Sequence, residues 1–120
     1  YFVRKRNYLA GLYKDRLSEV PLKLQTVDPN SLSSYHLFTI EITDPRFSRN
    51  LLYKYLKNNK IGCQVHYIPV HLQPFYKNKG FSAGQFENAE LYYKSCLSIP
   101  LHQGLNEDDI EISQSSPKIN

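Results

Sequence analysis

The first seventeen residues place apolar side chains at the spacing of an amphipathic helix. The apolar positions recur every three or four residues, so a helix over residues 1–17 would bring them onto one face. Pro21 disfavours a helical conformation at the residue before it, and the helix is therefore predicted to end upstream of this proline. The stripe consists of Leu9, Leu12, Tyr13 and Leu17.

Two segments after this helix have the pattern of β-strands. Residues 22–27 alternate between apolar and polar side chains, which predicts a short strand at the edge of a sheet. A turn is expected at residues 28–31, which are Asp, Pro, Asn and Ser. Residues 35–42 are rich in aromatic and β-branched side chains, so they predict a second and more regular strand.

A second helix is predicted to begin at Asp44 and Pro45. The Asp44 carboxylate can accept hydrogen bonds from the free N–H groups of a first turn, and proline is favoured at the first helical position. Residues 58–62 supply the stop and the turn, and residues 61–67 are then expected to return as a strand. The apolar stripe of this helix consists of Phe47, Leu51, Leu52, Tyr55 and Leu56.

The last third of the chain predicts a loop, a helix, a strand and the start of another helix. Residues 69–84 contain two prolines and two glycines, a composition typical of a long surface loop without regular structure. Asn106 is predicted to cap a short helix with an acidic first turn, and residues 97–100 predict a strand. The third helical stripe consists of Phe86, Ala89, Tyr93 and Cys96.

The order of these elements predicts an α+β fold. We expect a two-layer domain with a small, mainly antiparallel sheet and with helices on one face of the sheet. The chain has 120 residues, of which 41% are hydrophobic and 22% charged, values typical of one globular domain. The chain contains no Met, so we expect it to be a piece of a longer protein.

Composition also indicates where in the cell the protein is located. No apolar stretch approaches the roughly 20 residues that a membrane-spanning helix needs, so no membrane association is expected. Two cysteines, Cys63 and Cys96, are too few for a disulfide-stapled scaffold of this size. A reducing, cytoplasmic location is therefore predicted.

The net charge of +4 is unevenly distributed. Residues 1–60 contain 11 Lys and Arg against 5 Asp and Glu, whereas residues 61–120 contain 4 against 6. Most cations of the first half fall on the polar faces of the predicted helices, where solvated charge is the usual outcome. A basic nucleic-acid-binding domain stays open as an alternative, but no nucleic-acid-binding motif accompanies the charge.

The densest group of chemically versatile residues lies between Cys63 and Tyr76. Two imidazoles, those of His66 and His71, stand five residues apart, and Tyr76 follows them. Such a group can bind a metal, donate hydrogen bonds to an anionic ligand or serve only in polar packing. Metal binding is the weakest of the three, because a strand would place Cys63 and His66 on opposite faces. No metal is expected.

Motifs of independent catalysis are missing from the sequence. It contains neither a glycine-rich phosphate loop with its lysine nor the G-x-S-x-G nucleophile elbow. A Cys–His nucleophile is conceivable, but lone cysteines on apolar faces are more often small buried hydrophobes. An independent hydrolase is therefore not expected.

One motif resembles a known enzyme family. The sequence Ile61-Gly62-x3-His66-Tyr67-x-Pro69-x-His71-x-Gln73-x2-Tyr76 is similar to the C-terminal segment of the DegT-type sugar-nucleotide aminotransferases. Residues 6–13, 34–38, 49–62 and 97–102 resemble other pieces of the same segment, in the same order. The resemblance spans residues 1–112, so we expect an aminotransferase small domain there and a tail outside the family at residues 113–120.

The resemblance implies an enzymatic function that also requires a domain outside this chain. Enzymes of this family are fold-type I proteins that depend on pyridoxal phosphate, and their Schiff-base lysine lies in a large domain. The resemblance is greatest to enzymes that aminate UDP-linked 4-keto-6-deoxy sugars in spore-coat polysaccharide or pseudaminic acid biosynthesis. It implies the large domain, the nucleotide sugar, an amino donor such as glutamate and a second copy in a homodimer as partners.

The resemblance also assigns roles to residues of this chain. It implies substrate-binding roles for His66, Tyr67, His71 and Tyr76 and no catalytic residue in this segment. The isolated chain is therefore predicted to bind no cofactor and to have no transaminase activity. A stand-alone protein interaction module is the other alternative.

Overall fold

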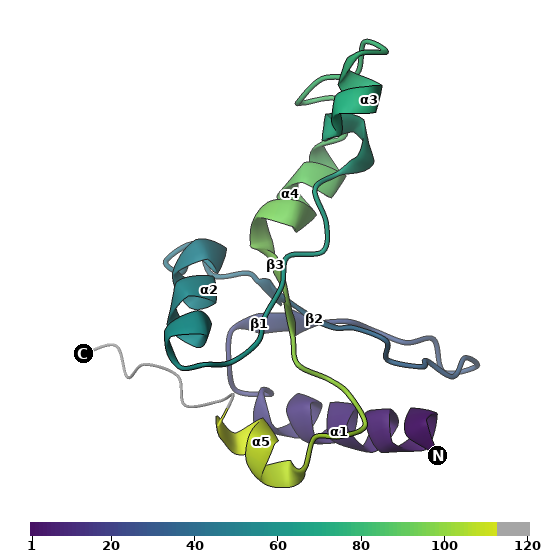
Figure 1. Ribbon diagram of the computed structural model, residues 1–120, viewed down its shortest axis with the longest axis vertical. Coiled ribbons are helices and arrows are strands. Elements are labelled where there is room, and N and C mark those ends of the chain that lie inside the picture. The colour runs from purple at the N-terminus through teal and green to yellow at the C-terminus, as the bar shows by residue number, and fades with distance from the viewer. Residues whose placement is uncertain (113–120) are drawn as a thin grey trace.

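The computed structural model describes residues 1–112 of the chain, and the predicted tail at residues 113–120 lies outside the described residues. Helices precede, connect and follow the strands of a small sheet (Figure 1). No helix among residues 1–112 is long and apolar enough to cross a membrane. The elements are α1 (Phe2–Arg16), β1 (Leu22–Leu24), β2 (Phe38–Ile42), α2 (Arg49–Asn58), η1 (Val70–Leu72), α3 (Pro74–Lys77), α4 (Glu87–Ser95), β3 (Cys96–Ile99) and α5 (Glu107–Ile112).

The three strands form one antiparallel sheet in the order β1-β2-β3. In its register, Leu22 pairs with Ile42 and Phe38 pairs with Ile99. The predicted α+β class with an antiparallel sheet is therefore confirmed. The first two strands are shorter than predicted. Strand β1 ends at Leu24 and not at residue 27. Strand β2 begins at Phe38 and not at Tyr35, whose backbone is left-handed (φ +44°).

Alternation along β2 divides the sheet into an apolar and a polar face. Phe38 and Ile40 are buried in a cluster with side chains of α1, α2 and α5. Thr39 and Glu41 point to the opposite face, as expected for successive residues of a strand. The buried cluster consists of Leu9, Ala10, Tyr13, Leu17, Tyr35, Phe38, Ile40, Leu56, Ile61, Cys63, Leu97, Ile99, Leu101 and Ile110.

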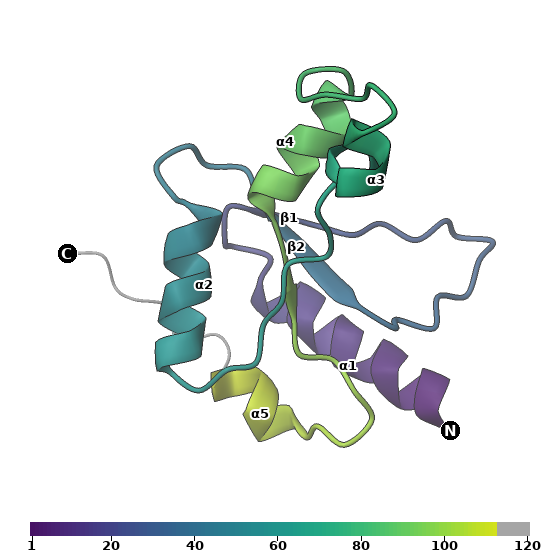
Figure 2. The ribbon, with the colours of Figure 1, turned by 45° about the horizontal axis from the view of Figure 1, so that its top comes forward.

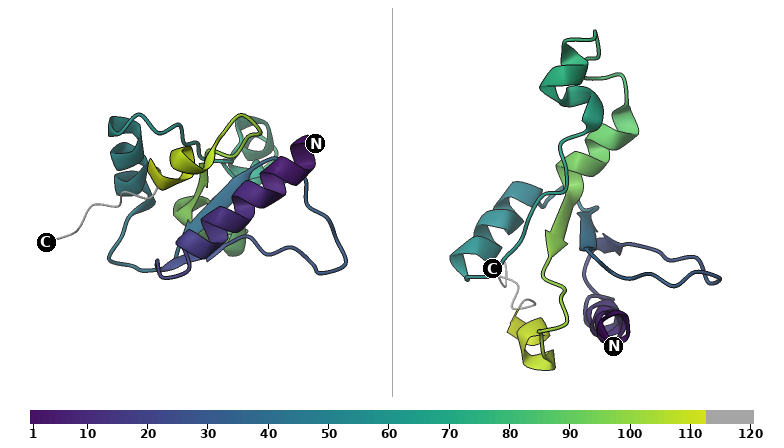
Figure 3. Two further views of the ribbon diagram at one scale, coloured as in Figure 1. Left: turned by 90° about the horizontal axis from the view of Figure 1, so that it is seen from below. Right: turned by 45° about the vertical axis from the view of Figure 1, so that its right-hand side comes forward.

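The helix α1 lies along the apolar face, and α5 packs beside it (Figure 3). Arg16 of α1 donates to Glu111 at 3.1 Å and to the Glu107 carbonyl at 3.2 Å. The first helix and the predicted cap of the last helix are both confirmed. Asn106 and Asp109 exchange side-chain to backbone hydrogen bonds of 2.9 Å, a capping box that satisfies two free N–H groups.

Residues 67–95 form a projection, here called the arm, that extends from the sheet away from α1 and α5 (Figures 1 and 3). Its helix α4 continues directly into β3, and α3 lies in the outer part of the arm (Figure 2). An unusually large share of its apolar and aromatic side chains is exposed to solvent. These are Tyr67, Ile68, Val70, Phe75, Tyr76, Phe81, Phe86, Leu91 and Tyr92.

The predicted start of the second helix is wrong. Asp44 caps a turn instead, because its carboxylate accepts from the backbone N–H of Arg46 at 2.9 Å and from the Arg46 guanidinium. The helix α2 begins at Arg49, where the hydroxyl of extended Ser48 accepts from the Asn50 N–H at 3.2 Å. Serine supplies the same type of cap as aspartate, so sequence alone did not distinguish the two positions.

Three further predictions after α2 are corrected. Residues 61–67 form no regular strand and pair with β3 only at Gln64. The segment at residues 69–84 is not wholly irregular, because it contains η1 and α3, and Pro74 occupies the first position of α3. Cys96 begins β3 and does not belong to the preceding helix, which ends at Ser95.

Candidate functional site

The chain leaves α2 and passes β3 along its free edge. Gln64 and Ser98 exchange two backbone hydrogen bonds, with N···O distances of 3.0 and 2.8 Å. Because β3 is otherwise paired only with β2, this bridge fixes the segment that precedes the arm against the edge of the sheet. Shortly after this bridge, the peptide bond between His66 and Tyr67 is cis.

Both ring nitrogens of His66 have a partner. Its Nε2 lies 2.8 Å from Oε1 of Gln64, and its Nδ1 lies 2.9 Å from the hydroxyl of Ser98. An amide oxygen only accepts, so Nε2–H donates to Gln64, and in the neutral ring Nδ1 accepts from Ser98. Ser98 is 5% exposed, and its hydroxyl also lies 3.4 Å from that of Thr39. His66 is thus held in one orientation from the polar face of the sheet.

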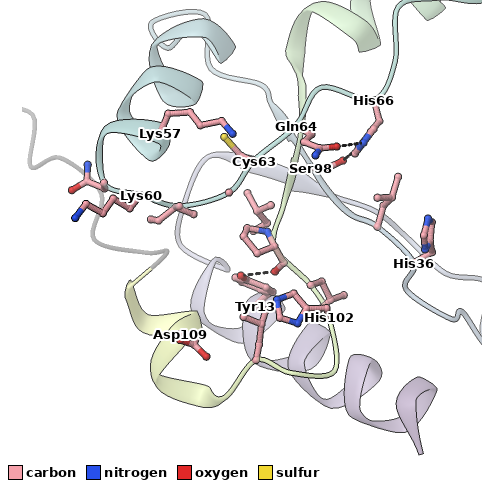
Figure 4. Close-up of a pocket in the computed structure, with 18 residues that line it drawn as sticks. Tyr13, His36, Lys57, Lys60, Cys63, Gln64, His66, Ser98, His102 and Asp109 are labelled. Carbon is pink, nitrogen blue, oxygen red and sulfur yellow. Dashed lines mark hydrogen bonds between the residues drawn. The ribbon is translucent and has the colours of Figure 1, made fainter.

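A groove of about 730 Å³ opens beside this segment (Figure 4). It is bounded by the end of α2, residues 61–66, the end of β3 and the start of α5. Tyr13 closes one side, where its hydroxyl donates to the Pro100 carbonyl at 2.9 Å. The groove combines apolar lining side chains with ionisable ones. Among the lining residues are Ile61, Cys63, Ile99, Leu101 and Leu105 as apolar members, and His36, Lys57, Lys60, His66, His102 and Asp109 as ionisable members.

The four predicted substrate-binding residues do not gather at this groove. His66 lines it, whereas Tyr67, His71 and Tyr76 belong to the arm. Tyr67 and Tyr76 are exposed, and the Tyr67 ring lies 4.5 Å from the His66 ring. His71 is only 7% exposed, and its Nε2 lies 2.8 Å from Oε1 of Glu90. The substrate-binding roles stay a prediction, with two of the four side chains open to a ligand and two engaged within the chain.

Sequence reasoning missed the residues that hold these side chains. Ser98 and Gln64 fix His66, and Glu90 bonds to His71. Glu90 lies 19 residues from His71, so no local pattern connects the two. Gln64 stands two residues before His66, and this spacing places both side chains on one side of an extended chain. It is the local pattern from which a partner of His66 could have been predicted.

Neither cysteine is suited to nucleophilic chemistry. Cys63 and Cys96 are both free and buried, and burial raises the pKa of each thiol. A thiol with a raised pKa carries little thiolate at neutral pH, so it is a poor nucleophile and a poor metal ligand. Within residues 1–112, no three side chains of His, Cys, Asp or Glu are grouped so as to hold a metal ion.

Fold and sequence define the class of this chain. It matches the DegT/DnrJ/EryC1/StrS aminotransferase family over residues 1–114 and belongs to that family. It is 31% identical over 113 residues to the spore coat polysaccharide biosynthesis protein SpsC of Bacillus subtilis. It is 34% identical over 110 residues to the UDP-4-amino-4,6-dideoxy-N-acetyl-beta-L-altrosamine transaminase of Campylobacter jejuni. The resemblance inferred from the sequence motif is confirmed.

The chain spans only about 29% of the length of these relatives, although the two alignments cover 90% and 89% of the chain. A solved structure gives the same proportion. The S. venezuelae protein DesV superimposes with a TM-score of 0.83 and 28% identity, over 92% of this chain and 29% of DesV. This chain therefore corresponds to a part of its relatives.

Aminotransferases of this family use pyridoxal phosphate. The lysines at the groove do not fit the Schiff-base role that this cofactor requires. A lysine that forms a Schiff base needs an enclosed site that favours its uncharged amine. The two lysines at the groove, Lys57 and Lys60, are both exposed, and the Lys57 ammonium lies 5.5 Å above the ring of Tyr53. No Schiff-base role is therefore assigned to either groove lysine.

Proposed function

We propose that this chain is the C-terminal small domain of a pyridoxal-phosphate-dependent aminotransferase that acts on a nucleotide-linked 4-keto-6-deoxy sugar. Its place would be in the biosynthesis of a surface polysaccharide or glycan. The names of two relatives support this proposal: one is a spore coat polysaccharide biosynthesis protein, and the other is a transaminase of a UDP-linked amino sugar. We further propose a cytoplasmic location.

The proposal rests on one contrast, between the share of this chain that matches the family and the share of its relatives' length that it spans. The family match includes nearly the whole chain, yet the chain spans less than a third of its relatives. Together with the exposure of Lys57 and Lys60, this supports a large domain elsewhere in the protein that carries the Schiff-base lysine. Pyridoxal phosphate bound there would supply the electron sink for transfer of the amino group.

The contribution of this chain would be to bind and orient the sugar nucleotide. Tyr67 and Tyr76 carry exposed phenols at the base and the outer part of the arm, and each can donate a hydrogen bond to a diphosphate or a sugar hydroxyl. His66 and His71 have ring nitrogens engaged within the chain, so their part in binding would be to fix the segment that presents the two tyrosines. An amino donor such as glutamate and a second copy in a homodimer complete the proposed partners.

The test uses the full-length protein encoded by the gene. The protein is incubated with pyridoxal phosphate, and the lysine adduct is trapped with borohydride and located by peptide mapping. UDP-linked 4-keto-6-deoxy sugar and glutamate are then supplied, and formation of the amino sugar and of 2-oxoglutarate is measured. We expect one labelled lysine outside residues 1–112 and glutamate-dependent amination.

Two results would overturn the proposal. Stoichiometric labelling of a lysine within residues 1–112 would show that the cofactor site was assigned to the wrong part of the protein. Absence of amination with every nucleotide-linked keto sugar supplied would refute the activity. Strongly salt-dependent retention of the inactive protein on DNA would then favour the nucleic-acid-binding alternative.

A further inference from the structure

One carboxylate oxygen in the arm joins three segments of the chain. Oε1 of Glu90, in α4, lies 2.8 Å from Nε2 of His71, in η1. The same oxygen accepts from the backbone N–H of Gly84 at 2.7 Å. Both contacts are shorter than the usual N–H···O distance of about 2.9 Å, as expected for bonds to a charged acceptor. We call these three residues the Glu90 clamp.

Within the clamp, the His71–Glu90 pair is sheltered, although Gly84 and much of the arm are exposed. The side chains of His71 and Glu90 are only 7% and 14% exposed. The ring of Phe86 lies 4.8 Å from the His71 ring and covers one side of the pair. The bonds from His71 and then from Gly84 lower the pKa of Glu90, so the carboxylate stays ionised at neutral pH.

The backbone at Gly84 is adapted to this contact. Its φ of +90° lies in the left-handed region, which glycine adopts without the strain that a β-carbon causes. This conformation aims its N–H at Glu90. The segment between α3 and α4 contains no strand. The N-cap residue Phe86 makes no side-chain hydrogen bond, and Glu90, inside α4, instead binds the backbone of the preceding segment at Gly84.

A series of rings extends from the clamp to Tyr76. Phe86, which packs on His71, lies 6.2 Å from the ring of Phe81, and Phe81 lies 6.1 Å from the ring of Tyr76. The Phe81 N–H also donates to the Tyr76 carbonyl at 3.2 Å. A displacement of the clamp would therefore be transmitted to Tyr76 through packed rings and one backbone bond.

We propose that Glu90 is a positioning residue, whose carboxylate fixes the arm in the conformation that presents Tyr76 to the sugar nucleotide. The kinetic part of this inference rests on the proposed function. The structural part concerns the arm alone. Loss of the carboxylate leaves the ring N–H of His71 without its acceptor in a sheltered position, where an unpaired polar group is costly, and it frees the exposed N–H of Gly84 to water.

The experiment uses the full-length protein and three variants. Glu90→Ala removes the acceptor, Glu90→Gln keeps an acceptor oxygen without the charge, and Glu87→Ala removes an exposed carboxylate from the same turn of α4 as a matched control. Hydrogen exchange of peptides that span residues 71–84 is followed by mass spectrometry. KM and kcat for the nucleotide sugar are measured alongside the absorbance of the bound cofactor.

We expect Glu90→Ala to accelerate exchange in residues 71–84 by about tenfold or more, as loss of bonds to a charged group predicts. KM should rise by about tenfold, with the cofactor absorbance unchanged, because the arm contributes to substrate binding and not to the cofactor site. Glu90→Gln should give intermediate values for exchange and KM, and Glu87→Ala should match the wild type.

The outcomes separate this inference from the proposed function. Unchanged exchange in Glu90→Ala overturns the clamp, and so does an effect of equal size in Glu87→Ala. Accelerated exchange with an unchanged KM overturns the positioning role. Should Glu90→Ala fail to fold, the same criteria apply to Glu90→Gln. If the wild-type enzyme shows no amination of any nucleotide-linked keto sugar, the proposed function fails and the positioning role fails with it, while the exchange result still decides the clamp.

Discussion

Replacement of Phe38 by alanine tests the account of the core most directly. Phe38 is the first residue of β2 and has no exposed surface. Its ring stacks on that of Tyr13 from α1, with centroids 5.0 Å apart, and lies 6.1 Å from the ring of Tyr35. The side chain therefore joins the sheet to the helix layer, and its removal leaves a cavity that the neighbouring rigid rings fill poorly.

The expected cost follows from this burial. Phe→Ala substitutions in well-packed cores typically cost about 3–5 kcal/mol. A loss of about 1.36 kcal/mol in the free energy of unfolding corresponds to a tenfold change in the equilibrium constant. Where the sheet opens and closes in rapid equilibrium, amide exchange in β2 should therefore accelerate roughly 150- to 5,000-fold. Phe38→Leu keeps most of the apolar volume and loses the ring pairing, so about 1–2 kcal/mol and roughly 5- to 30-fold are expected.

Hydrogen exchange measured by mass spectrometry on the full-length protein provides the assay, because peptides covering residues 38–42 report on this sheet alone. Phe75→Ala is the matched control: the Phe75 ring is 62% exposed, so exchange in β2 should change by no more than about twofold. The reasoning is refuted if Phe38→Ala changes β2 exchange by less than tenfold, or if Phe75→Ala has a comparable effect.

Three further predictions concern thiols, a helix cap and acid stability. Both thiols of the chain are buried with raised pKa values, so alkylation at pH 8 should be far slower in the native than in the denatured protein; equal rates would contradict their burial. Ser48→Ala should destabilise α2 by about 1 kcal/mol through loss of its cap and accelerate exchange there, whereas Asp44→Ala should leave exchange in α2 unchanged; the reverse order would restore the sequence prediction. The pKa of Glu90 is lowered, mainly by its bond from His71, so its contribution to stability is complete above its unfolded pKa of about 4.3 and is lost as the pH falls through the lower folded value. Exchange in the arm, corrected for intrinsic rates, should accelerate on acidification below about pH 4 in the wild type, and an equal acceleration in Glu90→Gln would argue against this assignment.

Local sequence patterns determined much of this protein. The helical spacing from Leu9 to Leu17 defined α1, and the side-chain alternation along β2 separated the buried Phe38 and Ile40 from the polar face. Asn106 identified the start of α5 through its capping oxygen. The motif from Ile61 to Tyr76 identified the family. These features depend on residues within a few positions of one another, so periodicity, capping chemistry and a short motif were enough to find them.

Only the tertiary structure decided the contacts between distant segments. Ser48 and Asp44 are equally good caps in sequence, and the turn closed by Asp44 settles that α2 begins after Ser48. The engagement of His71 depends on Glu90, 19 residues further along the chain. His66 is likewise oriented by Ser98, 32 residues away. Hydrogen bonds of this kind depend on where the folded backbone brings two side chains together, and no pattern of neighbouring residues encodes that distance.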